Sequence, residues 1–557
     1  MNNYEIADQF SMLSKLMDIH GENSFKSKSY STAAFNIERL PTDLATMTDA
    51  ELFGLRGIGD AIGKKIRELQ TTGTMYALED IISKTPPGII DMLDIKGLGP
   101  KKISVIWTEL GIESLGELEY ACNENRLVAL KGFGAKTQDS ILQSIVYFKQ
   151  NLGFHLWAEV EVVGEAVMAR LQAKYPQQLF ALTGDIRRQS ETVEFVEIVT
   201  DLDVATLKSE FEAMTDVVIN DVEDGVLTVH IPGSPRLKFY STTRARFYNK
   251  LFSTTGSPEF LDAFSQKYKL ADEPVSEEAI FADNQLAFVP AMQRETVGIL
   301  DKAAKHQITN VIQPGDLKAI IHSHSTASDG QHTIIQMAEA AIKQGFEYLV
   351  LSDHSQSAFY AGGLKPDQVA AQHQEIDALN DKLAPFKIFK SIESDILNDG
   401  SLDYSPQVLN TFDLVIASVH SNLKMSEEKA MGRVLAAIRN PYTAILGHPT
   451  GRLLLSRKGY PLDHKAIIDA CAEHNVVVEI NAHPRRLDLD WRWIEYAIEK
   501  GVLLSIDPDA HSIKGYKDTY YGVMAAQKGG LTAAGNLSSY TLAQFEEFLI
   551  KYRAKRN

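Results

Sequence analysis

The stretch Ala319–Gly330 reads Ala-Ile-Ile-His-Ser-His-Ser-Thr-Ala-Ser-Asp-Gly. Its apolar start favours a strand, on which His322 and His324, at positions i and i+2, point to the same face. The Asp329-Gly330 turn places a carboxylate nearby. Two imidazoles and an acid form a donor set that is typical of metal sites. The motif alone is equally compatible with an ordinary strand that carries two surface histidines.

Short apolar segments alternate with amphipathic segments from residue 316 onward. This βαβα rhythm predicts a parallel barrel or sheet. Seven strands in this length suit a barrel slightly smaller than the eight-stranded one. The expected strands are Ala319–His322, Tyr348–Ser352, Ile388–Ile392, Leu414–Ser418, Thr443–Leu446, Val476–Ile480 and Leu503–Ile506.

Residues that can bind a metal follow nearly every one of these strands, at the edge where α/β barrels carry their sites. Unrelated surface histidines would not be expected to keep this register over seven strands. The sequence therefore favours a metal centre. The candidate ligands are His322, His324, Asp329, His354, Glu393, His420, His448, Asp509 and His511.

The ligand set, together with Gly362-Gly363-Leu364, Gly400–Tyr404 and Arg486–Leu489, resembles the PHP (polymerase and histidinol phosphatase) phosphoesterase family from His322 to His511. The resemblance implies up to three metal ions. One ion would be held by His322, His324, Glu393 and Asp509; Glu393 would bridge to a second held by His420 and His448; and Asp329, His354 and His511 would hold the third. The departures are Pro508, and His483 in place of an asparagine.

Metal-bound water ionises near neutral pH and can attack phosphorus, so such a site predicts phosphoester hydrolysis. Arg452 or Arg485 is the expected phosphate clamp. Mixed histidine and carboxylate ligands favour Mn²⁺, Zn²⁺ or Fe²⁺ over Mg²⁺ alone, and the choice among these three stays open.

Three similar Gly-apolar-Gly hairpins, Leu55–Ile66, Ile95–Ile103 and Leu130–Thr137, lie in the first 150 residues, which read as helical. Glycines let the backbone turn tightly so that helix N-terminal amides face a phosphate, and the following lysines add charge. The hairpins resemble helix-hairpin-helix DNA-binding motifs. The expected DNA contacts are Gly57, Gly59, Lys64, Lys65, Gly97, Gly99, Lys101, Gly132, Gly134 and Lys136.

The first 80 residues also resemble the lyase domain of family X DNA polymerases, through Phe25–Tyr30 and Ala33-Ala34. Lys65 falls where lyases of that family carry a Schiff-base lysine. A phosphate-binding or solvated lysine is the alternative at this position.

Residues 151–290, which we call the palm-like segment, are predicted to be mixed α/β, with short strands at Glu159–Gly164 and Phe180–Gly184. The turn Thr183–Val193 resembles the nucleotide-binding turn of family X polymerases. By that resemblance, Gly184, Arg187 and Arg188 would form a vestigial nucleotide site.

The palm-like segment departs from the family where nucleotidyl transfer needs clustered carboxylates for two Mg²⁺ ions. An Asp-x-Asp is expected after the arginines, but the chain has Phe195-Val196-Glu197, and Lys238 replaces the third aspartate. We therefore expect a degenerate polymerase core.

As a whole, the chain resembles bacterial PolX proteins, in which a family X polymerase is fused to a PHP domain. Its 557 residues fit about three to four domains. The expected division is a helical DNA-binding region at 1–150, the palm-like segment at 151–290, a linker at 291–315 and a PHP segment at 316–557.

The composition is that of an ordinary globular protein, with 44% hydrophobic and 23% charged residues. A net charge of −17 argues against indiscriminate binding of nucleic acid over a broad surface, although local contacts remain open. Cys122 and Cys471 form no CxxC pattern, so thiolate metal sites and disulfides are not expected. The absence of a signal-like N-terminus and of a long apolar run predicts a cytoplasmic protein.

The leading hypothesis is a DNA-binding, metal-dependent 3′–5′ exonuclease in DNA repair, with cutting at abasic sites as a further activity. Gapped, nicked or 3′-end DNA is the expected substrate. Two alternatives stay open: a gap-filling family X polymerase, and a PHP phosphomonoesterase on a DNA-binding scaffold.

Overall fold

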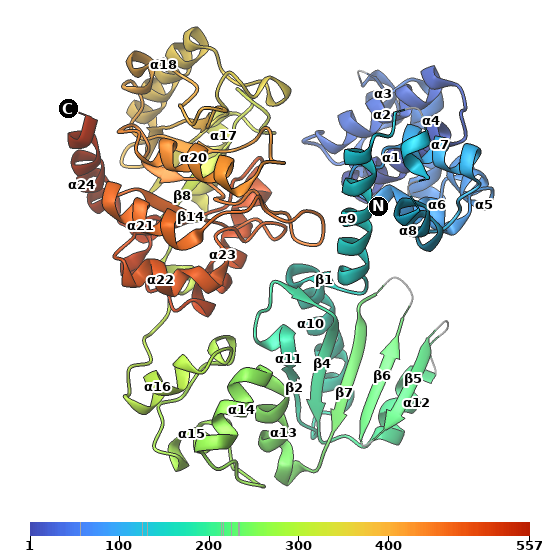
Figure 1. Cartoon of the computed structure of the whole chain (residues 1–557), viewed down its shortest axis with the longest axis vertical. Helices are drawn as coiled ribbons and strands as arrows, with labels where there is room; N and C mark the ends of the chain where they lie inside the picture. Colours follow the sequence, from blue (N-terminus) through green and yellow to red (C-terminus); the bar gives the residue numbers. More distant parts are fainter. Residues whose placement is uncertain are drawn as a thin grey trace. The chain divides into compact units, whose positions relative to one another are not determined.

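The structure of the chain is a computed structural model that describes residues 1–55, 57–124, 126–130, 132–212, 214, 217–223, 225–231 and 234–556. Arg56 and Lys131, which belong to two of the expected hairpins, lie outside the described residues. The chain divides into two compact units, Met1–Leu152 and Gly153–Asn557 (Figure 1).

The first unit is helical around one core of aliphatic and aromatic side chains, among them Phe10, Leu16 and Ile103. Amphipathic spacing builds it: in α4, the buried residues Ile62, Ile66 and Leu69 follow one helical face. Its helices are α1 (Asn3–Ile19), α2 (Ser24–Glu38), α3 (Asp49–Gly54), α4 (Asp60–Thr72), α5 (Tyr76–Ser83), α6 (Pro87–Asp91), α7 (Pro100–Leu110), α8 (Leu115–Asn123) and α9 (Ala135–Asn151).

The palm-like segment holds a five-stranded sheet of order β2-β4-β7-β6-β5, in which β4 and β7 run parallel. The expected strand at Glu159–Gly164 is instead part of helix α10, because Trp157, Val160, Gly164 and Leu171 bury one helical face. The elements are β1 (His155–Leu156), α10 (Trp157–Lys174), β2 (Phe180–Thr183), α11 (Gly184–Arg187), β3 (Thr192–Val193), β4 (Phe195–Thr200), α12 (Val204–Glu212), β5 (Val218–Glu223), β6 (Val226–His230) and β7 (Arg236–Ser241).

Four helices follow this sheet and pack around a phenylalanine-rich cluster that includes Phe252, Phe264 and Phe281. They are α13 (Phe247–Thr255), α14 (Pro258–Lys267), α15 (Glu277–Asp283) and α16 (Gly298–Ala304). The expected linker at 291–315 thus contains a helix that contributes Leu300 and Ala303 to this cluster.

The C-terminal segment, residues 316–557, contains only parallel strand pairs among its named strands, in the orders β10-β9-β8 and β11-β12-β13-β14-β15. We expected one seven-stranded barrel. The structure has two sheets, since the third expected strand, Ile388–Ile392, ends early as β10 and a separate strand, β11, begins at Glu393. Isolated bridges at Ser323–Ala510 and His354–Glu393 link them. The strands are β8 (Ala319–Ser323), β9 (Tyr348–Leu351), β10 (Lys387–Lys390), β11 (Glu393–Asp395), β12 (Ile416–Ser418), β13 (Ile445–Leu446), β14 (Val477–Asn481) and β15 (Leu504–Asp507).

Helices connect these strands and cover the sheets (Figure 1). The last one, α24, packs Phe545 against Tyr348 at the beginning of β9, away from the strand ends that carry the candidate ligands. The helices are α17 (Ile334–Lys343), α18 (Pro366–Leu383), α19 (Pro406–Leu409), α20 (Glu427–Ile438), α21 (His464–His474), α22 (Ile494–Glu499), α23 (Thr519–Lys528) and α24 (Leu542–Arg553). Among the described residues, no helix combines the length and apolar character that a membrane span requires.

Candidate metal centre

The structure brings the nine candidate ligands together at the carboxyl ends of the C-terminal strands. His322 is the penultimate residue of β8, Glu393 begins β11, and Asp509 follows β15. Parallel strands that share a register end at one edge, so ligands distant in sequence converge there.

A first group consists of His322, His324, Glu393 and Asp509, and all four side chains are buried. Nε2 of His324 lies 3.0 Å from Oδ1 of Asp509, and Nε2 of His322 lies 3.3 Å from Oε1 of Glu393. Donor atoms around one tetrahedral zinc-sized ion lie about 3 to 3.5 Å apart, so this spacing suits a shared ion.

A second group surrounds Glu393. Nε2 of His420 and Nε2 of His448 lie 3.0 and 2.9 Å from Oε1 of this carboxylate. On its other side, Nδ1 of His354 lies 3.0 Å from Oε2. Glu393 thus touches both groups, as a bridging carboxylate must.

A third group surrounds Asp329. Oδ1 of Asp329 lies 3.4 Å from Nε2 of His511, 3.6 Å from Nε2 of His354 and 4.0 Å from Nδ1 of His324. His324 therefore stands between this group and the first one, with one ring nitrogen facing each.

Unsatisfied donor and acceptor atoms test whether these residues fit metal ions. Within the described part of the chain, Nε2 of His322, Nδ1 of His324, Nδ1 of His354 and Oε2 of Glu393 are buried and have no hydrogen-bond partner. Buried polar atoms without partners are costly, and here they collect in one place and face one another. A set of divalent ions would satisfy them, so the residues fit the group that the sequence implies.

Other buried side chains orient the candidate ligands. Oε2 of Glu479 lies 2.5 Å from Nδ1 of His322, and Oδ1 of Asp395 lies 2.8 Å from Nδ1 of His420. A carboxylate on the far nitrogen fixes the ring and leaves Nε2 for the metal. Sequence reasoning missed both roles; the only signal was that each carboxylate lies on a strand that ends at the site.

Asp353 ties two ligand-bearing loops together. Its carboxylate accepts hydrogen bonds from the Ser325 backbone N–H at 2.8 Å and from Oγ of Ser328 at 2.5 Å. Because Asp353 precedes His354, this contact links the loop of Asp329 to the loop of His354.

The charges at the site shift several pKa values. Burial would lower the pKa of His420, but Glu393 and Asp395 outweigh it and raise the pKa to about 10. Burial would likewise lower the pKa of His322, yet Glu479, Glu393 and Asp509 hold it well above its usual value. Carboxylates thus concentrate positive charge here, and a divalent cation can take the place of those protons.

Three ligand positions have a backbone conformation that side chains rarely adopt. His322 has a φ of 60°, Asp509 a φ of 52° and His448 a φ of 21°. Left-handed residues other than glycine cost free energy and collect at functional sites, where the surrounding fold imposes them.

The site opens on the side of the third group. Side chains of the first group are buried, whereas Asp329 is 18% exposed and His511 39% exposed. A substrate therefore meets Asp329 and His511 first.

Arg452, one of the two expected phosphate clamps, is bonded to other groups of the protein. Its guanidinium contacts Glu191 of the palm-like segment, donates to Asp490 at 2.8 Å, and donates through Nε to the backbone carbonyl of Arg486 at 2.9 Å. These partners occupy the Arg452 guanidinium, so it is not placed to bind a phosphate. Arg485 is exposed on the neighbouring loop. Sequence reasoning missed Arg486, whose Nε lies 3.8 Å from Oδ2 of Asp509.

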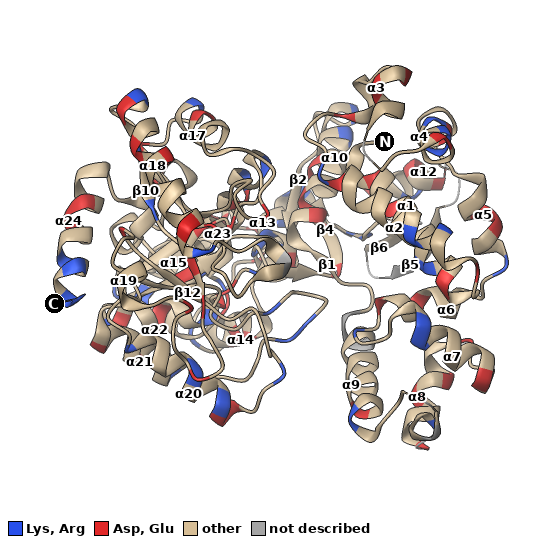
Figure 2. Ribbon diagram, turned by 90° about the horizontal axis from the view of Figure 1, so that it is seen from above, with Lys and Arg blue, Asp and Glu red and all other residues tan. Residues whose placement is uncertain are grey.

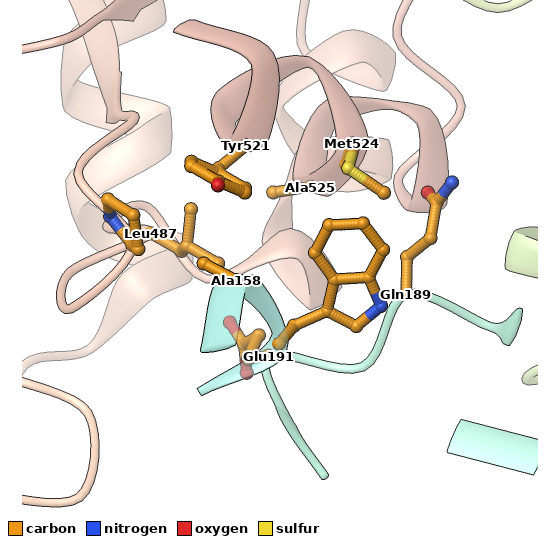
Figure 3. Close-up of a pocket in the computed structure, with 9 residues that line it drawn as sticks. Ala158, Gln189, Glu191, Leu487, Tyr521, Met524 and Ala525 are labelled. Carbon is orange, nitrogen blue, oxygen red and sulfur yellow. The ribbon is translucent and has the colours of Figure 1, made fainter. Parts of the chain in front are cut away.

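Figure 3 shows the small pocket next to this ion pair, where Glu191, Leu487 and Tyr521 face a common space, and Trp157 also lines it. Its volume of about 10 Å³ accommodates one water molecule at most. A nucleotide does not fit there.

The vestigial nucleotide turn is satisfied internally. Arg187 donates to Oε1 of Glu277 at 3.0 Å and Arg188 donates to the carbonyl of Thr255 at 2.7 Å. Gly184 begins α11 with a φ of 64°. The expected arginines are therefore near one another, but each is paired within the protein.

Cations and an aromatic ring stand where a family X polymerase needs carboxylates. Lys238 on β7 lies opposite Glu197 on β4 in the register of the two parallel strands. Its Nζ lies 5.4 Å from the ring centroid of Phe195. Arg236 lies over the same ring at 4.4 Å. Glu197 accepts a hydrogen bond from the Tyr240 hydroxyl at 2.6 Å. Glu194, the other carboxylate here, forms an ion pair with Arg236. Carboxylates that are already paired with a cation or a hydroxyl do not suit a two-metal site.

The three hairpins share one backbone conformation. Gly57, Gly97 and Gly132 have φ values of 85°, 90° and 90°, which favour glycine. Gly59 and Gly99 then cap α4 and α7 without a side-chain hydrogen bond, and Gly134 precedes α9. Lys64, Lys101 and Lys136 are exposed and Lys65 is partly exposed. Elsewhere acidic and basic residues are interspersed (Figure 2).

Two family models match the first unit. A helix-hairpin-helix domain matches residues 1–75, and a SAM-like helix-hairpin-helix tandem matches residues 89–145. These matches confirm the expected hairpins.

The chain is also similar to curated proteins. The probable phosphatase YcdX of Escherichia coli O81 is 28% identical over 242 residues, which are 41% of this chain and 82% of that protein. A probable phosphatase of Caldanaerobacter subterraneus subsp. tengcongensis is 29% identical over 171 residues, 29% of this chain and 60% of that protein. The DNA polymerase/3′–5′ exonuclease PolX of Bacillus subtilis is 32% identical over 571 aligned positions, covering 99% of each chain. The chain therefore belongs to the PolX family.

Proposed function

We propose that this protein is a DNA-binding, metal-dependent 3′–5′ exonuclease of DNA repair, and that the candidate metal centre is its active site. The observation that carries the proposal is the convergence of nine histidine and carboxylate side chains, four of which place a buried atom without a hydrogen-bond partner at the centre. The PolX relative is named as a 3′–5′ exonuclease, which agrees with this chemistry.

Two or three divalent ions, Mn²⁺ or Zn²⁺ in the first place and Fe²⁺ as an alternative, suit the mixed ligands. Such ions, when bound, supply a nucleophilic hydroxide and stabilise the leaving oxygen. Glu393 would bridge two of them, and Asp329, His354 and His511 would hold the one nearest solvent.

The chain's own residues would then bind and orient the scissile phosphodiester. Arg486 brings positive charge next to Asp509, and the exposed Arg485 precedes it in the chain, so a phosphate oxygen could accept from a guanidinium there. Glu479 and Asp395 would keep the histidine rings aimed at the centre. The hairpins of the first unit would hold the DNA backbone without reading its sequence, for example on gapped, nicked or 3′-end substrates.

A second candidate is a phosphomonoesterase on a DNA-binding scaffold, because the two shorter relatives are named probable phosphatases. Turnover on a short oligonucleotide, compared with turnover on a sugar phosphate, separates the two. Polymerase activity is not favoured, given Phe195 and Lys238 in the palm-like segment.

The test is the Mn²⁺-dependent release of nucleotides from a labelled 3′ end, with Zn²⁺ and Mg²⁺ compared on one preparation. We expect release by the purified chain and its loss in the double variant His322→Ala and His324→Ala. His306→Ala, which changes an exposed histidine outside the site, is the matched control. Undiminished release by the double variant would refute the proposal.

A further inference from the structure

A closed loop, Ser355–Leu364, begins directly after His354. Its two ends pair with each other through the bridge between Ser355 and Leu364, and the Leu364 N–H donates to the His354 carbonyl at 2.9 Å. The position of this loop is therefore fixed by a candidate ligand at its base.

The interior of the loop is also held firmly. The backbone N–H and the hydroxyl of Ser357 donate to the two carboxylate oxygens of Asp403, at 2.6 and 2.5 Å. Ala358 is fully buried. A Cβ on Gly363 would lie 1.9 Å from the Ser355 carbonyl oxygen, so only glycine permits this close approach.

Phe359 stands at the tip of this well-fixed loop and is 86% exposed. A single exposed apolar side chain is common on protein surfaces and carries no meaning by itself. Here its location matters. The Phe359 carbonyl accepts from the N–H of Gly362, and a Cβ added to Gly362 would lie 3.4 Å from the carbonyl oxygen of Ser328, whose neighbour is Asp329.

The loop that carries Phe359 thus lies next to His354 and Ser328, on the side where the metal centre opens. Asp329 and His511 are the exposed members of the ligand set, so a DNA end reaches the centre from their side. A base attached to the scissile phosphodiester then has to lie beside this rim, in water, unless a side chain covers it.

We infer that Phe359 stacks on the base of the 3′-terminal nucleotide and thereby makes the site prefer nucleotide-bearing ends. The inference rests on the proposed exonuclease function. Aromatic rings stack on any base, because every base offers a π-face, so such a contact holds a terminal nucleotide without sequence preference. The rigid loop lowers the entropy lost on binding.

The test compares the unaltered chain and the Phe359→Ala variant on two oligonucleotides that differ at the 3′ end. One single-stranded oligonucleotide ends in an ordinary 3′ nucleotide, and its partner ends in a tetrahydrofuran residue that lacks a base. We expect Phe359→Ala to raise KM roughly 5- to 100-fold on the ordinary end, with kcat little changed. On the baseless end, the variant and the unaltered chain should have the same KM.

Two variants control this experiment. Phe359→Trp keeps a stacking ring and should retain the low KM on the ordinary end. Ile550→Ala removes another exposed apolar side chain, from α24 at the opposite ends of the strands, and should change neither substrate. Equal effects of Phe359→Ala on both DNA ends, or no effect on either, would overturn the inference.

A binding measurement keeps the two proposals distinguishable. An oligonucleotide with 3′-terminal 2-aminopurine loses fluorescence when its base stacks on an aromatic ring. Binding by the full chain without added metal should quench this signal, and Phe359→Ala should abolish the quenching. Nuclease inactivity of the unaltered chain would sink the proposed function alone, whereas quenching that survives in Phe359→Ala would sink the stacking contact alone.

Discussion

Nδ1 of His322 lies 2.5 Å from Oε2 of Glu479, and both side chains are fully buried. The histidine belongs to β8 and the glutamate to β14, so the contact joins elements that are 157 residues apart. It fixes the imidazole so that Nε2 faces the first group of candidate ligands.

Glu479→Gln should weaken metal binding by about 10- to 100-fold, because an amide orients the His322 ring less strongly than a carboxylate does. Calorimetric titration of the metal-free protein with Mn²⁺ or Zn²⁺ measures this change in affinity. Glu473→Gln alters an exposed glutamate on α21 and should leave the affinity unchanged. Equal affinities for the Glu479 variant and the unaltered chain would contradict the orienting role.

Glu191→Ala should lower the free energy of unfolding by about 1 to 3 kcal/mol, because it removes a partner of the buried Arg452 guanidinium while Asp490 remains. Denaturant unfolding monitors the loss. Glu212→Ala breaks an exposed pair with Lys208 and should cost less than about 0.5 kcal/mol. A loss no larger than that of the surface pair would show that the Glu191 contact is dispensable.

Asp518 provides a pH-dependent test outside the metal centre. Burial raises the pKa of this carboxyl from 3.8 to about 7. The folded chain therefore binds this proton more tightly than the unfolded chain, so the stability due to Asp518 is full below 3.8 and falls as pH rises through 7. Asp518→Asn should stabilise the protein by about 1–2 kcal/mol at pH 8 and make no difference near pH 4. A stabilisation that is independent of pH would point to another cause.

Lys101→Ala and Lys64→Ala should weaken DNA binding and reduce the slope of log affinity against log salt by about 0.9 per lost phosphate contact on duplex DNA. The effect should be the same for unrelated sequences, because the hairpins contact the backbone. Fluorescence anisotropy over a salt series measures both quantities. Lys382→Ala, on α18, is the control and should leave the slope intact.

Templated incorporation of deoxynucleotides should be absent with Mg²⁺ and with Mn²⁺. Two-metal catalysis needs clustered carboxylates, and Phe195 and Lys238 remove two of them. Lys238→Asp alone should not create activity, because Phe195 still interrupts the site. Primer extension on a gapped duplex measures this incorporation. Extension by the unaltered chain would disprove the prediction that the palm-like segment is a degenerate polymerase core.

Much of the candidate site could be read from the sequence. The ligands follow apolar strands in a parallel arrangement, and the geometry of such strands places their carboxyl ends at one edge, so local pattern was enough to name His322, Glu393 or Asp509. The hairpins could also be predicted from the sequence, because tight turns require glycine at fixed positions. The replacement of two expected carboxylates by Phe195 and Lys238 could be recognised from residue identity alone.

Other features depended on tertiary structure. Glu159–Gly164 has the β-branched residues of a strand, but packing of Val160 and Gly164 against the sheet makes it a helix. Arg452 lies beside a glycine turn, as a phosphate clamp would. In the folded chain, however, its guanidinium forms an ion pair with Glu191, which is 261 residues away in the sequence.

The sequence was thus sufficient to name the candidate ligand set around His322 and His324. Contacts of the folded chain were needed to show that Glu479 and Asp395 orient the rings, that the centre opens at Asp329 and His511, and that the loop of Phe359 begins at His354. The physical reason is that a ligand's identity is a local property of its strand end. Its orientation, its exposure and its neighbours arise from contacts between segments that meet only in the folded chain.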